Sequence, residues 1–268
     1  MGELNPRTKR ALASASILAL TSMGIAAAAT GPAAATGPAA ATGPAVATAA
    51  PGATAIEYGS SNPLDPGGTS STHWAGFGTK GSYTSVSASW IQPKVTCTQS
   101  SEVVFWVGLD GWGNTPIEQD GTGASCNPGG SVQYFGWWET YPTNGINSYN
   151  KTVKAGDHIT SSVTAEGGGS YLMTVSDSTQ GWTENTHATA GSATPKSAEV
   201  IAEAPGSVQT GPVPLADFGT VNFTASVVDG SAIGSLSAKA ITMRNGGLVA
   251  SDSKLTGGED FTVTWHKY

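Results

Sequence analysis

Two short peptides carry residue types that could hydrolyse an amide: Ile117-Glu118-Gln119-Asp120-Gly121 and Ala198-Glu199-Val200-Ile201-Ala202-Glu203. A carboxylate can take a proton from an attacking water and later return it to a leaving nitrogen. A glutamine amide can donate a hydrogen bond to the oxyanion that develops on the attacked carbonyl. One glutamine and one glutamate would therefore suffice, but spacing alone does not select them from the other acidic residues.

The motifs of other hydrolases are missing from the sequence. It contains no Gly-x-Ser-x-Gly, no His-Glu-x-x-His, and no Asp-Thr-Gly or Asp-Ser-Gly. The four histidines are scattered without the spacing of metal ligands, at His73, His158, His187 and His266. We therefore expect neither a metal nor another cofactor.

The N-terminal 29 residues are typical of a secretory signal peptide. Arg7, Lys9 and Arg10 precede an apolar stretch, and the stretch ends in small alanines at residues 27–29. A membrane anchor is the weaker interpretation, because serines and threonines dilute the stretch and no stop-transfer flank follows. We expect cleavage and a secreted, extracellular product.

Residues 30–71 are predicted to be a linker or a propeptide. The hexapeptide Thr30-Gly31-Pro32-Ala33-Ala34-Ala35 recurs twice with small changes, and it holds neither charges nor large side chains. Such a segment cannot bury enough apolar surface to offset the entropy of ordering. Residues 72–268 suit a single domain with a sizeable core.

The charge balance argues against nucleic acid as a partner. The chain has 12 Lys+Arg and 19 Asp+Glu; removing the three basic residues and one acidic residue of 1–29 leaves 9 and 18, a net charge of −9. No later apolar run approaches the roughly 20 residues that a membrane helix needs. We expect a monomer that does not bind membranes once the signal peptide is removed.

Cys97 and Cys126 are the only cysteines. In an exported chain they are expected to form a disulfide. A catalytic thiol is the alternative, but neither cysteine lies in a sequence that resembles a cysteine-peptidase motif.

Period-two alternation with frequent turn residues predicts an all-β fold. Strands are expected at 83–91, 103–109, 133–139, 158–164, 171–175, 197–203, 221–228, 239–243 and 261–265. The segments 158–164 and 171–175 should form a hairpin around Gly167-Gly168-Gly169. Many short strands without a helical stripe indicate an antiparallel β-sandwich.

Alternation also assigns side chains to faces. Val103, Phe105, Val107 and Leu109 share one side of their strand, which we expect to be core, and Trp106, Gly108 and Asp110 share the other. Phe135, Trp137, Glu139 and Tyr141 line one side of theirs. Glu199, Ile201 and Glu203 share a side, opposite Ala198, Val200 and Ala202. The period does not predict which strands are neighbours.

An ordered set of motifs between residue 74 and the C-terminus resembles the glutamic peptidases, the eqolisin or G1 family. The matching residues are Trp74-Ala75-Gly76, Trp106 to Gly111, Ile117/Gln119/Gly121, Trp137-Trp138-Glu139 with Tyr141-Pro142, Gly156-Asp157, and Ala198 to Glu203. Each motif is weak by itself, and Trp106 to Gly111 is the most distinctive. The motifs occur in the same order as in the family, which argues against a chance match.

The resemblance implies a sandwich of two long antiparallel sheets with a Gln/Glu catalytic pair in the concavity of one sheet. It assigns Gln119 as the oxyanion donor and Glu203 as general base and then acid. Around them it suggests a supporting or substrate-binding group, which comprises Trp74, Trp106, Asp110, Trp137, Glu139 and Glu199. Glu199 could raise the proton affinity of Glu203 by like-charge repulsion. Val200 and Ala204 depart from the common family pattern, which could change substrate preference or pH optimum.

The implied function is a secreted acid endopeptidase acting on polypeptides. Two other functions remain open. Sandwiches with tryptophans and carboxylates on one sheet also bind glycans, so a lectin-like carbohydrate-binding module is one alternative. A glycosidase using Glu139 and Glu203 as paired carboxylates is the other.

Overall fold

The computed structural model describes residues 69–268, except 115, 191–193 and 208–210. The predicted signal peptide and nearly all of the predicted linker lie outside these residues. Ser70 and Ser71, which we assigned to the linker, form a short strand, β1, that pairs with Thr242 and Met243. Among the described residues, no helix has the length and apolar character needed to cross a membrane.

Nearly all regular structure is β-strand, as the sequence predicted. The strands are β1 (Ser70–Ser71), β2 (Trp74–Lys80), β3 (Ser85–Ile91), β4 (Ser101–Asp110), β5 (Ile117–Cys126), β6 (Val132–Tyr141), β7 (Asn144–Tyr149), β8 (His158–Gly167), β9 (Ser170–Asp177), β10 (Trp182–Thr189), β11 (Ser197–Glu203), β12 (Gly206–Ser207), β13 (Gly211–Pro212), β14 (Thr220–Val228), β15 (Ser231–Ala232), β16 (Lys239–Arg244), β17 (Leu248–Asp252) and β18 (Phe261–Trp265). One 3-10 turn, η1, covers Ile233–Leu236.

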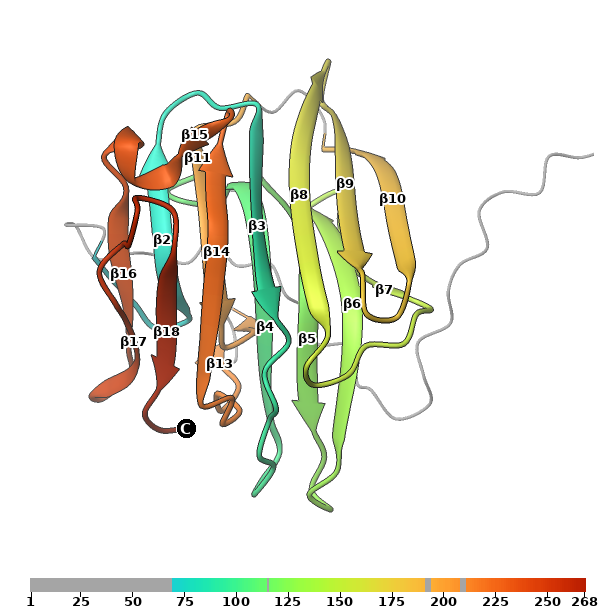
Figure 1. Ribbon diagram of the computed structural model, residues 1–268, viewed down its shortest axis with the longest axis vertical. Coiled ribbons are helices and arrows are strands. Elements are labelled where there is room, and N and C mark those ends of the chain that lie inside the picture. Colours follow the sequence, from blue (N-terminus) through green and yellow to red (C-terminus); the bar gives the residue numbers. More distant parts are fainter. Residues whose placement is uncertain (1–68, 115, 191–193, 208–210) are drawn as a thin grey trace, which may run out of the picture. The chain divides into compact units, whose positions relative to one another are not determined.

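The long strands form two antiparallel layers. One layer has the order β10-β9-β8-β3-β14-β18-β17, and the other has the order β16-β2-β11-β4-β5-β6-β7. Hydrogen bonds between β16 and β17 join them at one side. Figure 1 shows the first layer in front of the second, with their strands running in similar directions. The predicted β-sandwich and the β8–β9 hairpin are confirmed.

Alternate residues of the strands fill the space between the layers. The face assignment in β4 is confirmed, since its core residues (Val103, Phe105, Val107, Leu109) belong to the main apolar cluster. Phe105 packs edge-on against Phe218, with ring centroids 5.4 Å apart. A second, smaller cluster lies on the other side of the same layer. It comprises Trp74, Val104, Trp106, Trp137, Ile201 and Ile241.

We name the side of the second layer that carries this smaller cluster the site face. Strands β16, β2, β11, β4 and β6 contribute the residues of this cluster. The side chains of Glu199, Ile201 and Glu203 point toward it, because they alternate with the core residues of β11.

Among the strands longer than two residues, the sequence analysis did not predict β2, β5, β7, β10 and β17. Strand β5 is central in its layer. It pairs along its whole length with β4 and with β6. At its end, Cys126 forms the predicted disulfide with Cys97, with the Cα atoms 5.4 Å apart. The disulfide therefore ties the end of β5 to the segment that leads into β4.

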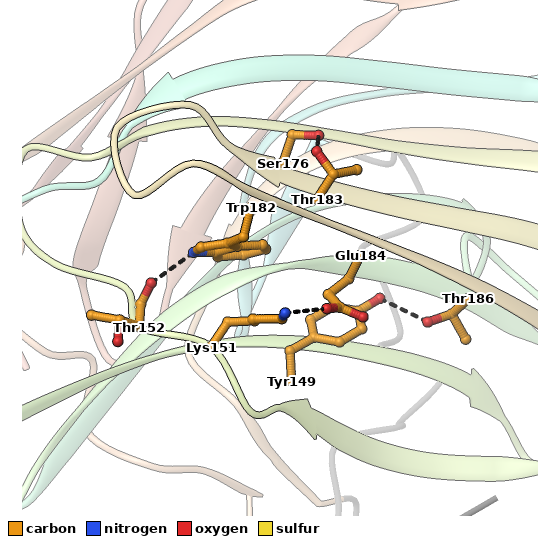
Figure 2. Close-up of polar contacts among 8 residues, drawn as sticks. All are labelled: Tyr149, Lys151, Thr152, Ser176, Trp182, Thr183, Glu184 and Thr186. Atoms are coloured by element: carbon orange, nitrogen blue, oxygen red, sulfur yellow. Dashed lines mark hydrogen bonds and ion pairs between the residues drawn. The ribbon is translucent and has the colours of Figure 1, made fainter.

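Side chains close the side of the sandwich opposite β16 and β17. Here the edge strand β7, with the segment up to Thr152 that follows it, faces the edge strand β10 (Figure 2). The contacts are Tyr149 OH to Thr186 Oγ1 at 3.2 Å, Lys151 Nζ to Glu184 Oε1 at 2.8 Å, and Trp182 Nε1 donating to Thr152 O at 2.8 Å. They connect the layers without backbone pairing.

Candidate active site

One row of residues crosses the site face at the level of Gln119. Glu199 of β11 pairs with Gly108 of β4, Gly108 pairs with Gln119 of β5, and Gln119 pairs with Glu139 of β6. Cross-strand partners in adjacent antiparallel strands project to the same side of the sheet. Two carboxyl groups and one amide therefore line this row, with a glycine gap between Glu199 and Gln119.

Glu203 lies four residues further along β11, opposite Val104. Two strand spacings and four residues would put the Cα atoms of Gln119 and Glu203 about 17 Å apart on a flat sheet. These long side chains can therefore act together only on a group placed between them. The residue that occupies the floor between them is Trp106.

Trp106 connects the two parts of the site. Its indole Nε1 donates to Glu203 Oε2 at 2.7 Å. Its ring also lies over Gly108, since a Cβ at that glycine would be 2.7 Å from the ring carbon Cζ3. One rigid side chain thus extends from the Glu203 carboxyl to the row that holds Gln119. Trp74 packs against it edge-on, with ring centroids 5.2 Å apart.

The Gln119 amide is held by Glu139. Gln119 Nε2 donates to Glu139 Oε2 at 2.7 Å, and both side chains are buried. Because an amide nitrogen carries two hydrogens, this bond leaves one hydrogen available. Gln119 Oε1 has no hydrogen-bond partner within the described part of the chain.

Burial raises the pKa of Glu203 to about 7. The Trp106 N–H opposes this effect and lowers the pKa, because it stabilises the carboxylate. The Trp74 indole N–H also lowers the pKa of Glu203, although its geometry falls short of a hydrogen bond. A carboxyl with a pKa in this range can both accept and donate a proton in mildly acidic solution.

The like-charge effect that we expected from Glu199 is not a cause of the raised pKa of Glu203. Glu199 is four residues away on the same strand, and its own pKa is raised by burial first and then by the charges of Asp110 and Glu118. The charge of Glu203 instead raises the pKa of Glu139, after the larger effect of burial. Glu139 is therefore the carboxyl electrostatically linked to Glu203.

Asp110 holds a turn. Its backbone φ is 66°, and its Oδ1 accepts hydrogen bonds from the Lys196 N–H and from the side chain of Asn114. Trp137 lies in the smaller apolar cluster, opposite Gly121 of β5. Asp110 thus shapes the loop after β4, and Trp137 forms part of the site face.

Two features near the site were not predicted from the sequence: the burial of Glu118 and the position of Trp112. Glu118 lies opposite Leu109 and so projects to the core side of the layer. Burial raises the pKa of Glu118 to about 9, with Asp110 adding to the effect. Across the described ranges, no group of three or more His, Cys, Asp or Glu side chains could hold a metal ion.

Comparisons with known proteins agree with this architecture. The Peptidase A4 family matches residues 72–265. Aspergillopepsin-2 of Aspergillus niger is 31% identical over 166 residues, which are 60% of this chain and 58% of that protein. The chain thus spans less than two thirds of this curated relative.

Solved structures with the same fold are glutamic peptidases. Scytalido-glutamic peptidase with a peptide-based transition state analog has a TM-score of 0.63 and 27% identity, over 73% of this chain and 98% of that chain. Aspergilloglutamic peptidase from Aspergillus niger has a TM-score of 0.54 and 29% identity, over 62% of this chain and 99% of that chain. The resemblance to the glutamic peptidases is confirmed, and the chain belongs to the Peptidase A4 family.

Proposed function

We propose that the chain is a secreted, monomeric acid endopeptidase that hydrolyses polypeptides with Gln119 and Glu203. The observation that carries the proposal is the Trp106 indole, which binds Glu203 and covers the glycine beside Gln119. A peptide group above this ring would have a carboxyl on one side and an amide donor on the other. Relatives have been solved with a transition state analog inhibitor and with the tripeptide Ala-Ile-His.

The proposed reaction uses one carboxyl group twice. The Glu203 carboxylate takes a proton from water while the water oxygen attacks the peptide carbonyl carbon. The free Gln119 N–H donates to the resulting oxyanion, and one such donor is worth about 3 kcal/mol of barrier. Protonated Glu203 then gives its proton to the nitrogen as the C–N bond breaks, which regenerates the carboxylate.

Glu139 is proposed to position the Gln119 amide. By accepting one amide hydrogen, it fixes the plane of the amide and directs the second hydrogen. This also argues against a glycosidase that uses Glu139 and Glu203, because Glu139 is already engaged by Gln119. A lectin-like module has no use for a carboxyl whose pKa is raised to about 7.

The pKa of Glu203 bears on the pH dependence. At about 7 it lies above the ordinary value of 4.5, so Glu203 holds its proton in acid and loses it as pH rises through about 7. The first step uses the carboxylate, which is the minor form in acid, so the fall in activity that we expect toward neutral pH rests on the resemblance to the glutamic peptidases and not on this shift. Full activity at neutral pH with none at about pH 3 would contradict this assignment.

The test is digestion of denatured casein at about pH 3.5, with EDTA and pepstatin present. Wild type is compared with Glu203→Gln, Gln119→Ala and Glu199→Gln. The last is a matched control, because Glu199 is a buried glutamate on the same strand and side as Glu203. We expect the first two variants to lose at least about a hundredfold in kcat and Glu199→Gln to stay within about tenfold of wild type.

Equal cleavage by wild type and Glu203→Gln would overturn the assignment of Glu203. Loss of activity only in Glu199→Gln would identify Glu199 as the partner of Gln119. A folded wild type that cleaves no protein would favour a binding module instead.

A further inference from the structure

One aromatic side chain of the site face has no role in the proposed reaction. Trp112 lies in the loop between β4 and β5 and is 7% exposed. A Cβ at Gly78 of β2 would lie 3.0 Å from the Trp112 ring carbons Cε3 and Cζ3, and 3.3 Å from Glu199 Cγ. The indole therefore fills the space above Gly78, on the side that bears Glu199.

This position is the β2 end of the row through Gln119. Gly78 pairs with Glu199, which pairs with Gly108, which pairs with Gln119. Three strand spacings place the indole about 14 Å from Gln119, a distance that about four residues of extended peptide would span. A peptide crossing the strands from Gln119 toward β2 would therefore meet Trp112.

The indole is held in place from several sides. The Trp112 backbone N–H donates to Ser197 Oγ at 3.3 Å, and Lys80 Nζ lies 5.0 Å from the ring centroid. The Gly111 N–H donates to Asn114 Oδ1 at 3.0 Å, which fixes the turn that carries Trp112. A side chain with so many contacts is a fixed boundary.

Glycines on both sides of Glu199 leave space above the sheet. Wherever a glycine removes a side chain, an aromatic ring can occupy the space. Trp106 fills the space over Gly108, and Trp112 fills the space over Gly78. The second ring has no role in the proposed reaction.

We propose that Trp112 is a specificity-determining residue that excludes bulky substrate side chains from the subsite at the β2 end of the Gln119 row. The proposal rests on the peptidase function proposed above. Lys80, on the outer side of the indole, adds a positive charge to this subsite, which favours acidic over basic residues there. The recognised substrate class is thus a polypeptide with a small or acidic residue at this position.

The experiment measures cleavage of a peptide library in which each position around one scissile bond is varied in turn. Wild type, Trp112→Ala, Trp112→Phe and Lys80→Met are compared by mass spectrometry. Trp182→Ala is the control, because Trp182 is a partly buried tryptophan that packs against the core from β10 of the other layer (Figure 2).

At one position of the substrate, we expect Trp112→Ala to raise kcat/KM for peptides with a large aromatic residue at least about tenfold, relative to peptides with alanine at that position. Trp112→Phe should give a smaller change in the same direction, which keeps the test valid if the alanine variant folds poorly. Lys80→Met should remove a preference for acidic residues at that position. Trp182→Ala should leave the preference profile as in wild type.

If wild type cleaves the library and every variant retains its profile, Trp112 does not determine specificity although the peptidase function stands. A change shared by Trp112→Ala and Trp182→Ala would show a general loss of stability and would also overturn the proposal. If wild type and all variants cleave nothing, the proposed function and this inference fail together.

Discussion

Replacing Glu118 with glutamine should reduce the loss of folding stability between acidic and neutral pH. Glu118 is fully buried on β5, and burial together with neighbouring Asp110 raises its pKa from 4.5 to about 9. Tyr171 faces both carboxyls, and no basic residue is among the causes of the Glu118 shift. In the folded state, this carboxyl is therefore expected to keep its proton at pH 7.

The sign of the effect follows from proton binding. Between pH 4.5 and 9 the folded state binds a proton at Glu118 that the unfolded state has released. The stabilising contribution of Glu118 is therefore fully present below pH 4.5 and falls as pH rises, by about 1.4 kcal/mol per pH unit for one group. From pH 4.5 to 7 the loss assigned to Glu118 is about 3 kcal/mol, a large part of a typical total of 5–15 kcal/mol.

The assay is urea unfolding followed by tryptophan fluorescence at several pH values from about 4 to 7. Glu118→Gln has no proton to lose, so its free energy of unfolding should decline by about 3 kcal/mol less than that of wild type over this range. The half-buried Glu259→Gln serves as control and should decline as wild type does. Because the pH dependences of the two proteins are compared, any pH-independent change in stability that the substitution causes cancels.

Identical declines in wild type and Glu118→Gln would refute the reasoning. They would mean that Glu118 is ionised in the folded protein, or that it keeps an ordinary pKa through a partner that burial alone does not reveal.

Three other perturbations test separate parts of the structure. Trp106→Phe removes the hydrogen-bond donor to Glu203, so the pKa of Glu203 and the acid-side limb of the plot of kcat/KM against pH should rise by about 1 to 2 pH units. A hydrogen bond to a charged group is worth about 1.5–3 kcal/mol. An unchanged plot would contradict this hydrogen bond. Replacing both Cys97 and Cys126 with alanine should lower the free energy of unfolding by about 2–4 kcal/mol, and reducing agent should then have no further effect on urea unfolding. Gly121→Ala should destabilise by about 2 kcal/mol or more, because its Cβ would lie 2.0 Å from a carbonyl oxygen of β4; normal thermal stability would show that the strands separate at little cost.

The sequence predicted nine of the 18 described strands, and in each of these one side faces the core. In β11 the predicted segment, 197–203, agrees with the observed strand at both ends. In β4 both sides are buried, so residues 103–109 form a nearly continuous apolar run that predicts a strand without any alternation. These elements could be predicted because their apolar side chains lie where water is excluded.

Strand β5 could not be predicted in this way. Its residues include Glu118 and Asp120, which a sequence pattern assigns to solvent, and Gly121, which weakens a strand prediction. In the structure, both acids are fully buried, and Asp120 accepts a hydrogen bond from Ser161 Oγ at 2.6 Å. Burial of uncharged acids reverses the usual meaning of an acidic residue in a pattern.

The composition of the site was more predictable than its connections. The family motifs selected Gln119 and Glu203, but they could not show that Glu139 rather than Glu199 is coupled to Glu203. That distinction depends on the register of β4, β5, β6 and β11. A period of two assigns each residue to a face, but it does not fix which strand lies next to which.

The contacts between β7 and β10 have a consequence for behaviour in acidic solution. Edge strands can recruit a second molecule by backbone pairing, and proteins often prevent this with charged side chains. Two of the three contacts between the β7 segment and β10 join neutral groups, the Tyr149–Thr186 and Trp182–Thr152 pairs, so protons do not disrupt them. The layers would thus stay closed on this side in acid, where repulsion between carboxylates on neighbouring molecules is weakest. Resistance to aggregation in acid would then depend on this closed edge instead of on charge.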